Sequence, residues 1–214
     1  HDITGLWPIT STPTPVVDLA VGQLDGQAGV DVAAIGGGGL YVYNSTGGLM
    51  WSDTNVDGRT VEIGDVDGDG HNEVVTADYT VEPGSTGFGV PVAGGWVLAF
   101  DGIGDGAGNS TLLYSFYTET RKRISDVELG YLDGNPADVE VVAITEPINA
   151  TLFAIDIDSP AVEQEMWRYS IDWPSMYYGE SLAIGDVDRD YKSEVVAATS
   201  APDHCIYAFD ALDR

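Results

Sequence analysis

Acidic side chains alternate along one short, glycine-rich stretch of this 214-residue chain. The backbone carbonyl of His71 falls among them, and Gly68 and Gly70 permit the tight turns that bring alternate oxygens inward. Calcium takes roughly six to eight oxygen ligands, which carboxylates and carbonyls supply. The spacing therefore predicts a calcium site in which the His71 carbonyl joins the carboxylates at positions one, three, five and nine: Asp65, Asp67, Asp69 and Glu73.

A second stretch repeats this pattern with larger residues in place of the two glycines. Arg189 and Tyr191 replace the two glycines, which makes the turn stiffer. The positive charges of Arg189 and Lys192 also weaken the local negative field. We expect weaker calcium binding here, with these ligands: Asp186, Asp188, Asp190, the carbonyl of Lys192, and Glu194.

Two further stretches occupy the same place in the sequence pattern but have lost ligands. One offers Gln23, Asp25, Gln27 and Asp31; the other offers Tyr131, Asp133 and Asn135, with Glu140 displaced by one residue. Two carboxylates supply too few strong ligands for a calcium ion, and amides are poorer donors. We expect both loops to be metal-free and held by hydrogen bonds from side chains to the backbone.

Every one of these stretches follows an apolar segment that ends in glycine and precedes a valine-rich segment. A third short apolar segment follows in every repeat and a fourth in the first three repeats, and no helical periodicity appears anywhere. Four short antiparallel strands per repeat are typical of propeller blades. The sequence predicts one all-β domain over 1–214, a β-propeller of four four-stranded blades, at about 18–52, 61–117, 126–170 and 182–214.

The last repeat ends before its fourth strand. Residues 5–9 (GLWPI) resemble the fourth strand of the first repeat, 48–52 (GLMWS). We expect the N-terminal strand to complete the last blade and leave no open edge. The alternative is that this strand completes the blade of a neighbouring molecule, so that the protein self-assembles as a fibre subunit.

The segments GDVDGDGHNEVV and GDVDRDYKSEVV resemble the FG-GAP/VCBS repeats of integrin-alpha-like β-propellers. This resemblance implies calcium in the loop between the first two strands of a blade, and an extracellular module for adhesion, ligand binding or surface assembly. The third strands (such as IYAFD) and the tryptophan-bearing fourth strands are also similar, more weakly, to quinoprotein propeller repeats. A fragment of a propeller enzyme, of the polysaccharide-lyase or quinoprotein-dehydrogenase kind, is therefore the alternative.

The charge of the chain limits its partners. Asp and Glu number 35 against 8 Lys and Arg, which gives a net charge of −27. Such a chain repels nucleic acid and anionic membranes, and it fits a saline or calcium-rich setting. No apolar run is long enough to span a membrane, and the chain begins at His1, so we expect a trimmed, secreted chain. Sequons at Asn44, Asn109 and Asn149 favour an extracellular or cell-surface glycoprotein.

No catalytic constellation is visible, so we expect a binding protein rather than an enzyme. None of the three histidines is accompanied by a nucleophile in a recognisable motif. Long loops at 81–95, 118–126 and 172–180 would share one face of a propeller. Their aromatic residues form either a platform for a cell-surface carbohydrate or protein, or packing for the loops themselves: Phe88, Trp173, Tyr177 and Tyr178.

Overall fold

The computed structural model describes residues 15–78, 94–118, 122–146, 150–161, 163–171, 179–200 and 204–211. These residues form fifteen β-strands in four antiparallel sheets, which we number in chain order. In every sheet the strands pair in the order in which they follow one another along the chain. Each repeat of the sequence thus corresponds to one sheet.

Sheet 1 contains β1 (Val16–Gly22), β2 (Asp31–Gly36), β3 (Gly39–Tyr43) and β4 (Leu49–Asp53). Sheet 2 contains β5 (Val61–Gly64), β6 (Glu73–Asp78), β7 (Trp96–Asp101) and β8 (Leu112–Tyr117). Sheet 3 contains β9 (Arg123–Gly130), β10 (Glu140–Glu146), β11 (Thr151–Ile155) and β12 (Glu165–Ser170). Sheet 4 contains β13 (Gly179–Gly185), β14 (Glu194–Thr199) and β15 (Ile206–Asp210).

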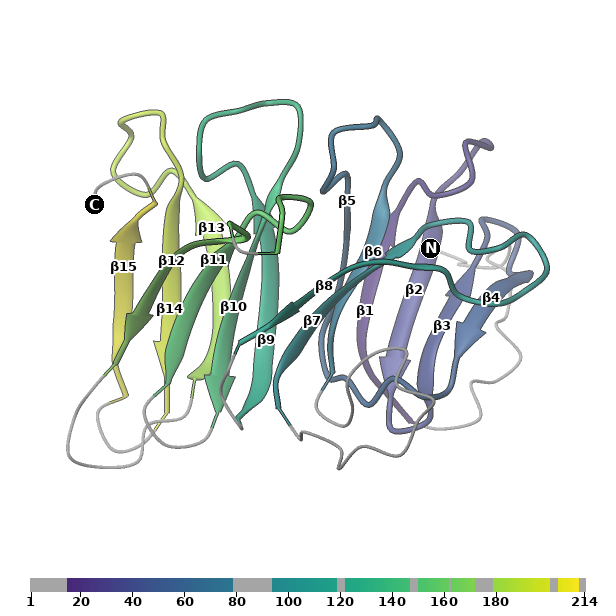
Figure 1. Cartoon of the computed structure of the whole chain (residues 1–214), viewed down its shortest axis with the longest axis horizontal. Helices are drawn as coiled ribbons and strands as arrows, with labels where there is room; N and C mark the ends of the chain where they lie inside the picture. Colours follow the sequence, from purple (N-terminus) through teal and green to yellow (C-terminus); the bar gives the residue numbers. More distant parts are fainter. Residues whose placement is uncertain are drawn as a thin grey trace, which may run out of the picture.

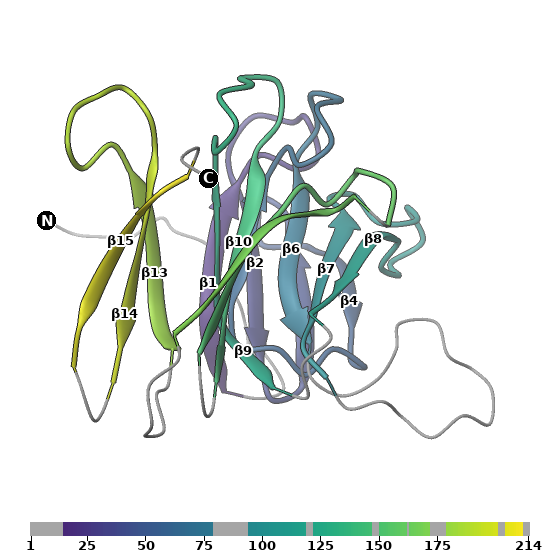
Figure 2. The same cartoon turned by 60° about the vertical axis from the view of Figure 1, so that its left-hand side comes forward.

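The four sheets stand side by side in a row, from sheet 1 to sheet 4, as Figures 1 and 2 show. The middle strands of sheets 1 to 3 are covered on both faces, and every residue of β3 and of β11 is buried. This is why these strands are almost entirely apolar rather than alternating between apolar and polar residues. The core consists of three layers, each between consecutive sheets.

Consecutive sheets meet through the same contact three times. The glycine that ends each first strand faces an aliphatic side chain of the next first strand; a methyl group on Gly22 would come within 2.4 Å of Ile63 Cγ2. The corresponding pairs are Gly64 with Leu129 at 2.7 Å and Gly130 with Ile184 at 2.6 Å. Only glycine permits so close an approach of two strands.

A side-chain oxygen four residues before each of these glycines reinforces the contact. Asp18 Oδ2 accepts the Val61 N–H at 3.0 Å. Thr60 Oγ1 accepts the Val127 N–H at 3.3 Å, and Asp126 Oδ2 accepts the Leu182 N–H at 2.7 Å. Each first strand is therefore joined to the next by one hydrogen bond and one glycine contact.

The prediction of an all-β chain with four repeats is confirmed. Closure of the row into a ring is not observed among the described residues, because their hydrophobic layers join sheet 1 to 2, 2 to 3 and 3 to 4, but not 4 to 1. Residues 5–9, predicted to complete sheet 4, lie outside the described part of the chain. The described residues include no helix that is long and apolar enough to cross a membrane.

Candidate metal centres

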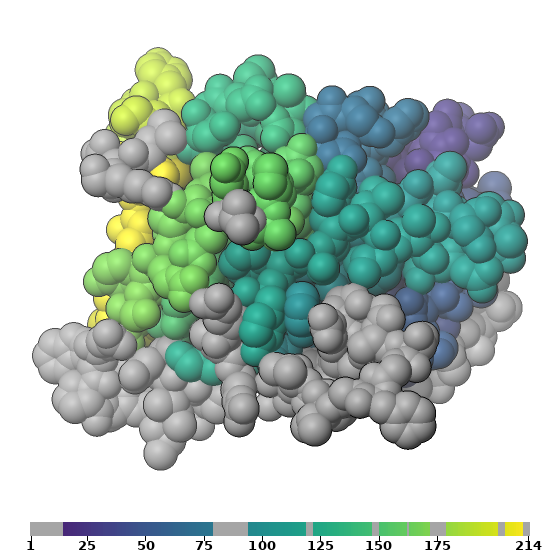
Figure 3. Space-filling view, viewed as in Figure 1, coloured from purple at the N-terminus to yellow at the C-terminus, as the bar shows by residue number. Residues whose placement is uncertain are grey.

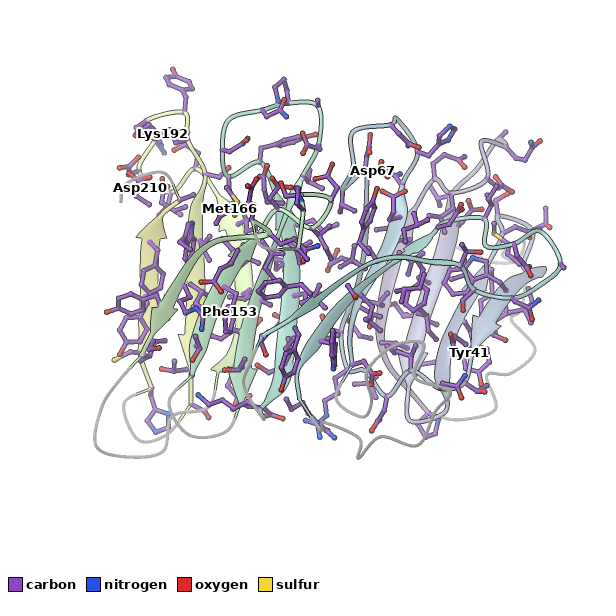
Figure 4. The ribbon with its side chains drawn as sticks, in the orientation of Figure 1. Tyr41, Asp67, Phe153, Met166, Lys192 and Asp210 are labelled. Carbon is purple, nitrogen blue, oxygen red and sulfur yellow. The ribbon has the colours of Figure 1, made fainter. Side chains whose placement is uncertain are left out.

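The loops between the first and second strands of all four sheets lie along one edge of the row, one loop on each sheet. We call them loop 1 (23–30), loop 2 (65–72), loop 3 (131–139) and loop 4 (186–193). They form a line of separate projections along the upper edge in Figure 3. Figure 4 places Asp67 of loop 2 and Lys192 of loop 4 toward this edge, whereas Phe153 lies among the strands. The predicted calcium ligands are thus on loops that rigid strands hold in place.

Loop 2 brings three of its predicted ligands together. Asp65, Asp67 and Glu73 each offer a carboxylate oxygen, and these oxygens all lie within 4.8 Å of one another. A calcium ion with bonds of about 2.4 Å places opposite ligands about 4.8 Å apart, so these three oxygens are close enough together to share one ion. Asp69, at the fifth position, is exposed and lies outside this group; its Oδ1 accepts the His71 N–H at 2.8 Å.

Internal hydrogen bonds shape loop 2 so that its carboxylates converge. Asp65 accepts the N–H groups of Gly68 at 2.8 Å and Gly70 at 2.9 Å, and both glycines have left-handed backbone, with φ of 71° and 86°. Glu73 is buried, and its Oε2 accepts the Val66 N–H at 3.0 Å. Burial, which is the largest effect, and the nearby Asp charges raise the pKa of Glu73 to about 7. A cation would relieve this repulsion.

Loop 4 assembles the same three positions. Asp186, Asp188 and Glu194 form a second group whose oxygens lie within 4.8 Å of one another. Asp190, again at the fifth position, lies outside the group and forms an ion pair with Lys192, Nζ to Oδ2 at 3.8 Å. This ion pair agrees with the expected weakening of the negative field around loop 4.

Loop 4 follows the backbone path of loop 2 at an energetic cost. Arg189 and Tyr191 both have φ of 71°, the left-handed conformation that the glycines of loop 2 adopt without strain. Side chains with a Cβ lose roughly 1 kcal/mol or more in this conformation. The loop therefore keeps its ligand positions but stores strain that loop 2 lacks.

Arg189→Gly and Tyr191→Gly should each stabilise the protein. Tyr191 is 97% exposed, so its removal costs little packing. Relief of about 1 kcal/mol per site should raise the melting temperature by about 2–4 °C in a chain of this size. Thermal unfolding measures the shift, with Lys192→Gly as the matched control, because Lys192 is not among the described residues with positive φ. A lower melting temperature for both glycine variants would show that these conformations carry no strain.

Loop 1 is closed by an amide where loop 2 has a carboxylate. Gln23 Nε2 donates to the carbonyl of Gln27 and, at 3.0 Å, to the carbonyl of Gly29, which corresponds to the seventh-position carbonyl of His71. Asp31 Oδ2 accepts the Leu24 N–H at 2.8 Å. The expected side-chain-to-backbone hydrogen bonds are therefore present, and the amide hydrogens point at oxygens that a cation would otherwise bind.

Loop 3 is held in a related way. Glu140 Oε2 accepts the Leu132 N–H, Asp133 Oδ1 accepts the Asn135 N–H, and Asn135 Oδ1 accepts the Ala137 N–H. The displaced Glu140 thus performs the same backbone contact as Glu73. A buried carboxylate at the start of the second strand accepts the N–H of the second loop residue in all four sheets: Asp31, Glu73, Glu140 and Glu194.

The sequence analysis missed a third acidic group. Asp138, from loop 3, meets Asp156 and Asp158, which follow β11 in the same sheet, and their oxygens also lie within 4.8 Å of one another. The hydrogen bond with Asp156, then burial, raises the pKa of Asp158 to about 6. The Asp156–Ile157–Asp158 alternation after a third strand was the available signal, but no spacing rule links it to a loop some twenty residues earlier.

This third group borders the loop 2 group. The Val139 N–H donates to the Asp65 carbonyl at 3.0 Å, which ties loop 3 to loop 2. The charge of Asp67 contributes to the raised pKa of Asp158. Tyr114 donates its hydroxyl to Asp67 Oδ2 at 2.9 Å, and burial followed by this hydrogen bond raises the pKa of Tyr114 to about 12. The two groups form one continuous acidic region.

The residues predicted to bind a ligand, Phe88, Trp173, Tyr177 and Tyr178, lie outside the described part of the chain, as does Asn149. The other two sequons, at Asn44 and Asn109, follow third strands; Asn44 is half-buried and Asn109 exposed. A groove of about 310 Å³ separates loops 3 and 4. The exposed side chains of Tyr131 and Tyr191 line it.

Comparisons with known proteins give a structural result only. No family model matches the chain, and no curated protein matches it significantly. Solved structures do match. A Bacillus licheniformis rhamnogalacturonan lyase of family PL11 aligns with a TM-score of 0.60 at 16% identity, over 92% of this chain and 41% of that chain. This chain therefore shares its fold with part of that protein.

Two further solved structures show the same similarity of fold. The rhamnogalacturonan lyase YesW aligns with a TM-score of 0.58 at 16% identity, over 86% of this chain and 40% of that chain. The exotype rhamnogalacturonan lyase YesX aligns with a TM-score of 0.58 at 18% identity, over 86% and 39%. The chain thus spans about two fifths of the length of these enzymes, and identities this low establish a shared fold rather than a shared activity.

Proposed function

We propose that this chain is a calcium-binding β-propeller module of an extracellular protein, and that it acts by binding rather than by catalysis. The observation that carries the proposal is the recurrence of one arrangement: in loops 2 and 4, carboxylates at positions one, three and nine converge within 4.8 Å. Two loops of different sequence, on two sheets, place the same three groups together. Recurrence of this kind favours a built site over an accidental meeting of surface acids.

The chemistry of the donors favours calcium. Every ligand in the three acidic groups is a carboxylate oxygen, without the thiolate or imidazole that zinc prefers. The fifth-position carboxylates of Asp69 and Asp190 lie in the same loops, and so do the carbonyls of His71 and Lys192. Calcium accepts such irregular sets more readily than magnesium, which requires near-octahedral geometry. When bound, the ion would neutralise the loop and fix its conformation.

The charge of the chain supports an extracellular setting. With a net charge of −27, the folded state repels itself unless salt or bound cations screen it. Calcium and salt are both plentiful outside cells. The partner we propose is a protein or a carbohydrate at a cell surface, and the groove between Tyr131 and Tyr191 is the aromatic surface that the described residues offer to it.

Isothermal titration calorimetry with calcium on the chelator-treated protein tests the proposal. We expect at least two sites, with loop 2 filling first because loop 4 contains Lys192, Arg189 and a strained backbone. Magnesium at the same concentration should give a weaker signal. The absence of binding heat together with an unchanged melting temperature in calcium would overturn the proposed function.

A second candidate function is suggested by the comparisons. Three rhamnogalacturonan lyases share the fold over at least 86% of this chain, and the alternative we propose is that the chain forms part of a polysaccharide-cleaving enzyme. Incubation with rhamnogalacturonan in calcium, followed through the ultraviolet absorbance of the unsaturated product, distinguishes the two functions. Product formation would favour the lyase; saturable binding of the polysaccharide without product would favour the binding module.

A further inference from the structure

The outer side of sheet 1 exposes apolar residues whose counterparts in the other sheets are buried or half-buried. Leu19 is 59% exposed and Val21 67% exposed. Relative to the glycine that ends each first strand, Leu19 corresponds to Val61, Val127 and Leu182, which are 0%, 0% and 5% exposed. Those three residues pack on the preceding sheet. Sheet 1 has the same surface, with no described sheet before it.

The opposite end of the row shows the complementary feature. Ile206, on the third strand of sheet 4, is 76% exposed and pairs with Ala198 of the second strand. The residues at the same register in sheets 1 to 3 are Leu40, Val97 and Leu152. Those three residues are fully buried, because the following sheet covers them. A methyl group on Gly185 would meet nothing within 4 Å, whereas the equivalent glycines each face the next sheet.

We propose that a second copy of this chain packs against this exposed surface, with sheet 4 of one copy placed before sheet 1 of the other. The contact would continue the interface that the chain already forms three times. Gly185 would face Val21, as Gly22 faces Ile63. Ser181 Oγ would accept the Leu19 N–H, as Thr60 Oγ1 accepts the Val127 N–H. This inference is independent of the proposed calcium function.

The two ends complement each other and are not self-complementary, so the contact is head-to-tail. Such contacts produce a closed ring when the rotation between copies closes, and a filament when it does not. The net charge of −27 opposes association at low ionic strength. Screening shortens to about 3 Å at 1 M salt, so the association should appear at high salt.

Sedimentation velocity of the full chain over a range of concentrations, in 1 M sodium chloride, tests the proposal. We expect wild type to associate, and Leu19→Asp or Gly185→Val to prevent association without unfolding the chain. Gly185→Val is the sharper variant, since its new side chain has open space in the single chain but would collide with the docked copy. Leu113→Asp is the matched control, because Leu113 is 41% exposed on β8 of sheet 2, which lies at neither end of the row.

A mixture of the two interface variants tests whether the partner at this surface is a second copy of the chain. Each keeps one intact end, so equal amounts of Leu19→Asp and Gly185→Val chains should form a 1:1 dimer and nothing larger. The proposal is overturned if wild type stays monomeric at its highest soluble concentration, or if both variants associate as wild type does. A monomer that Gly185→Val destabilises would instead show that sheet 4 closes on sheet 1 within one molecule.

Discussion

Asp67→Ala should remove most of the rise in melting temperature that calcium produces. Asp67 is one of the three converging carboxylates of loop 2, and its loss removes both a ligand and a negative charge. A ligand at a hundred times its dissociation constant stabilises the folded state by about 2.7 kcal/mol, or about 5–10 °C for a chain of this size. Thermal unfolding in calcium and in chelator measures the difference.

Two further variants distinguish metal binding from simple destabilisation. Asp133→Ala changes the same loop position in loop 3, where no converging group contains that residue, so it should leave the calcium-dependent shift intact. Asp67→Asn keeps an oxygen that can accept the Tyr114 hydroxyl and should still lose the calcium response. Equal calcium shifts for wild type and Asp67→Asn would contradict the assignment of loop 2.

In chelator, the stability of the protein should fall as the pH rises from about 5 to 8. Burial, the largest effect, raises the pKa of Glu73, of Glu140 and of Glu62 to about 7 each, from an ordinary value of 4.5. Between pH 4.5 and about 7 these carboxyl groups are protonated in the folded state and ionised in the unfolded state. Their contribution to stability is therefore fully present below the unfolded pKa of 4.5 and is lost as the pH rises through the folded pKa of about 7. Each group contributes less than about 3 kcal/mol to this loss of stability, because solvent screens a partly exposed carboxylate.

Calcium should reverse this trend, because the ion binds the deprotonated carboxylates and its affinity rises with pH. Melting temperatures at several pH values, with calcium and with chelator, measure both trends. Glu73→Gln should flatten the decline in chelator and also lose the calcium response of loop 2. Glu140→Gln should flatten the decline and keep that response. Stability in chelator that climbs steadily from pH 5 to pH 8 would contradict the assigned pKa shifts.

The convergence in loops 2 and 4 was predictable because it is local. Alternating residues in a loop of nine positions have few ways to turn, and Gly68 and Gly70 indicate the path that brings Asp65 and Glu73 together. The same local logic predicted that loop 1 would close through hydrogen bonds. It did not reveal that Arg189 and Tyr191 would adopt the glycine conformation rather than change the path of loop 4.

The role of the ninth-position carboxylate was not visible from the sequence pattern. Glu73 was predicted as a ligand only, yet it also accepts the Val66 N–H and anchors the loop to the second strand. Glu140, displaced by one residue, makes the equivalent bond with Leu132. A flexible side chain can still reach the same backbone N–H after a displacement of one residue, whereas a rule based on fixed spacing does not predict this.

The sequence by itself determined the strands, the four repeats and the convergence of carboxylates within single loops, because strand alternation and turn chemistry depend on near neighbours. Only the tertiary structure decided which distant groups meet. Asp138 joins Asp156 and Asp158 because loop 3 and the end of β11 lie at the same end of sheet 3. Leu19 and Ile206 are exposed because burial in stacked sheets requires a neighbouring sheet on each side, and the two ends of the described row each lack one.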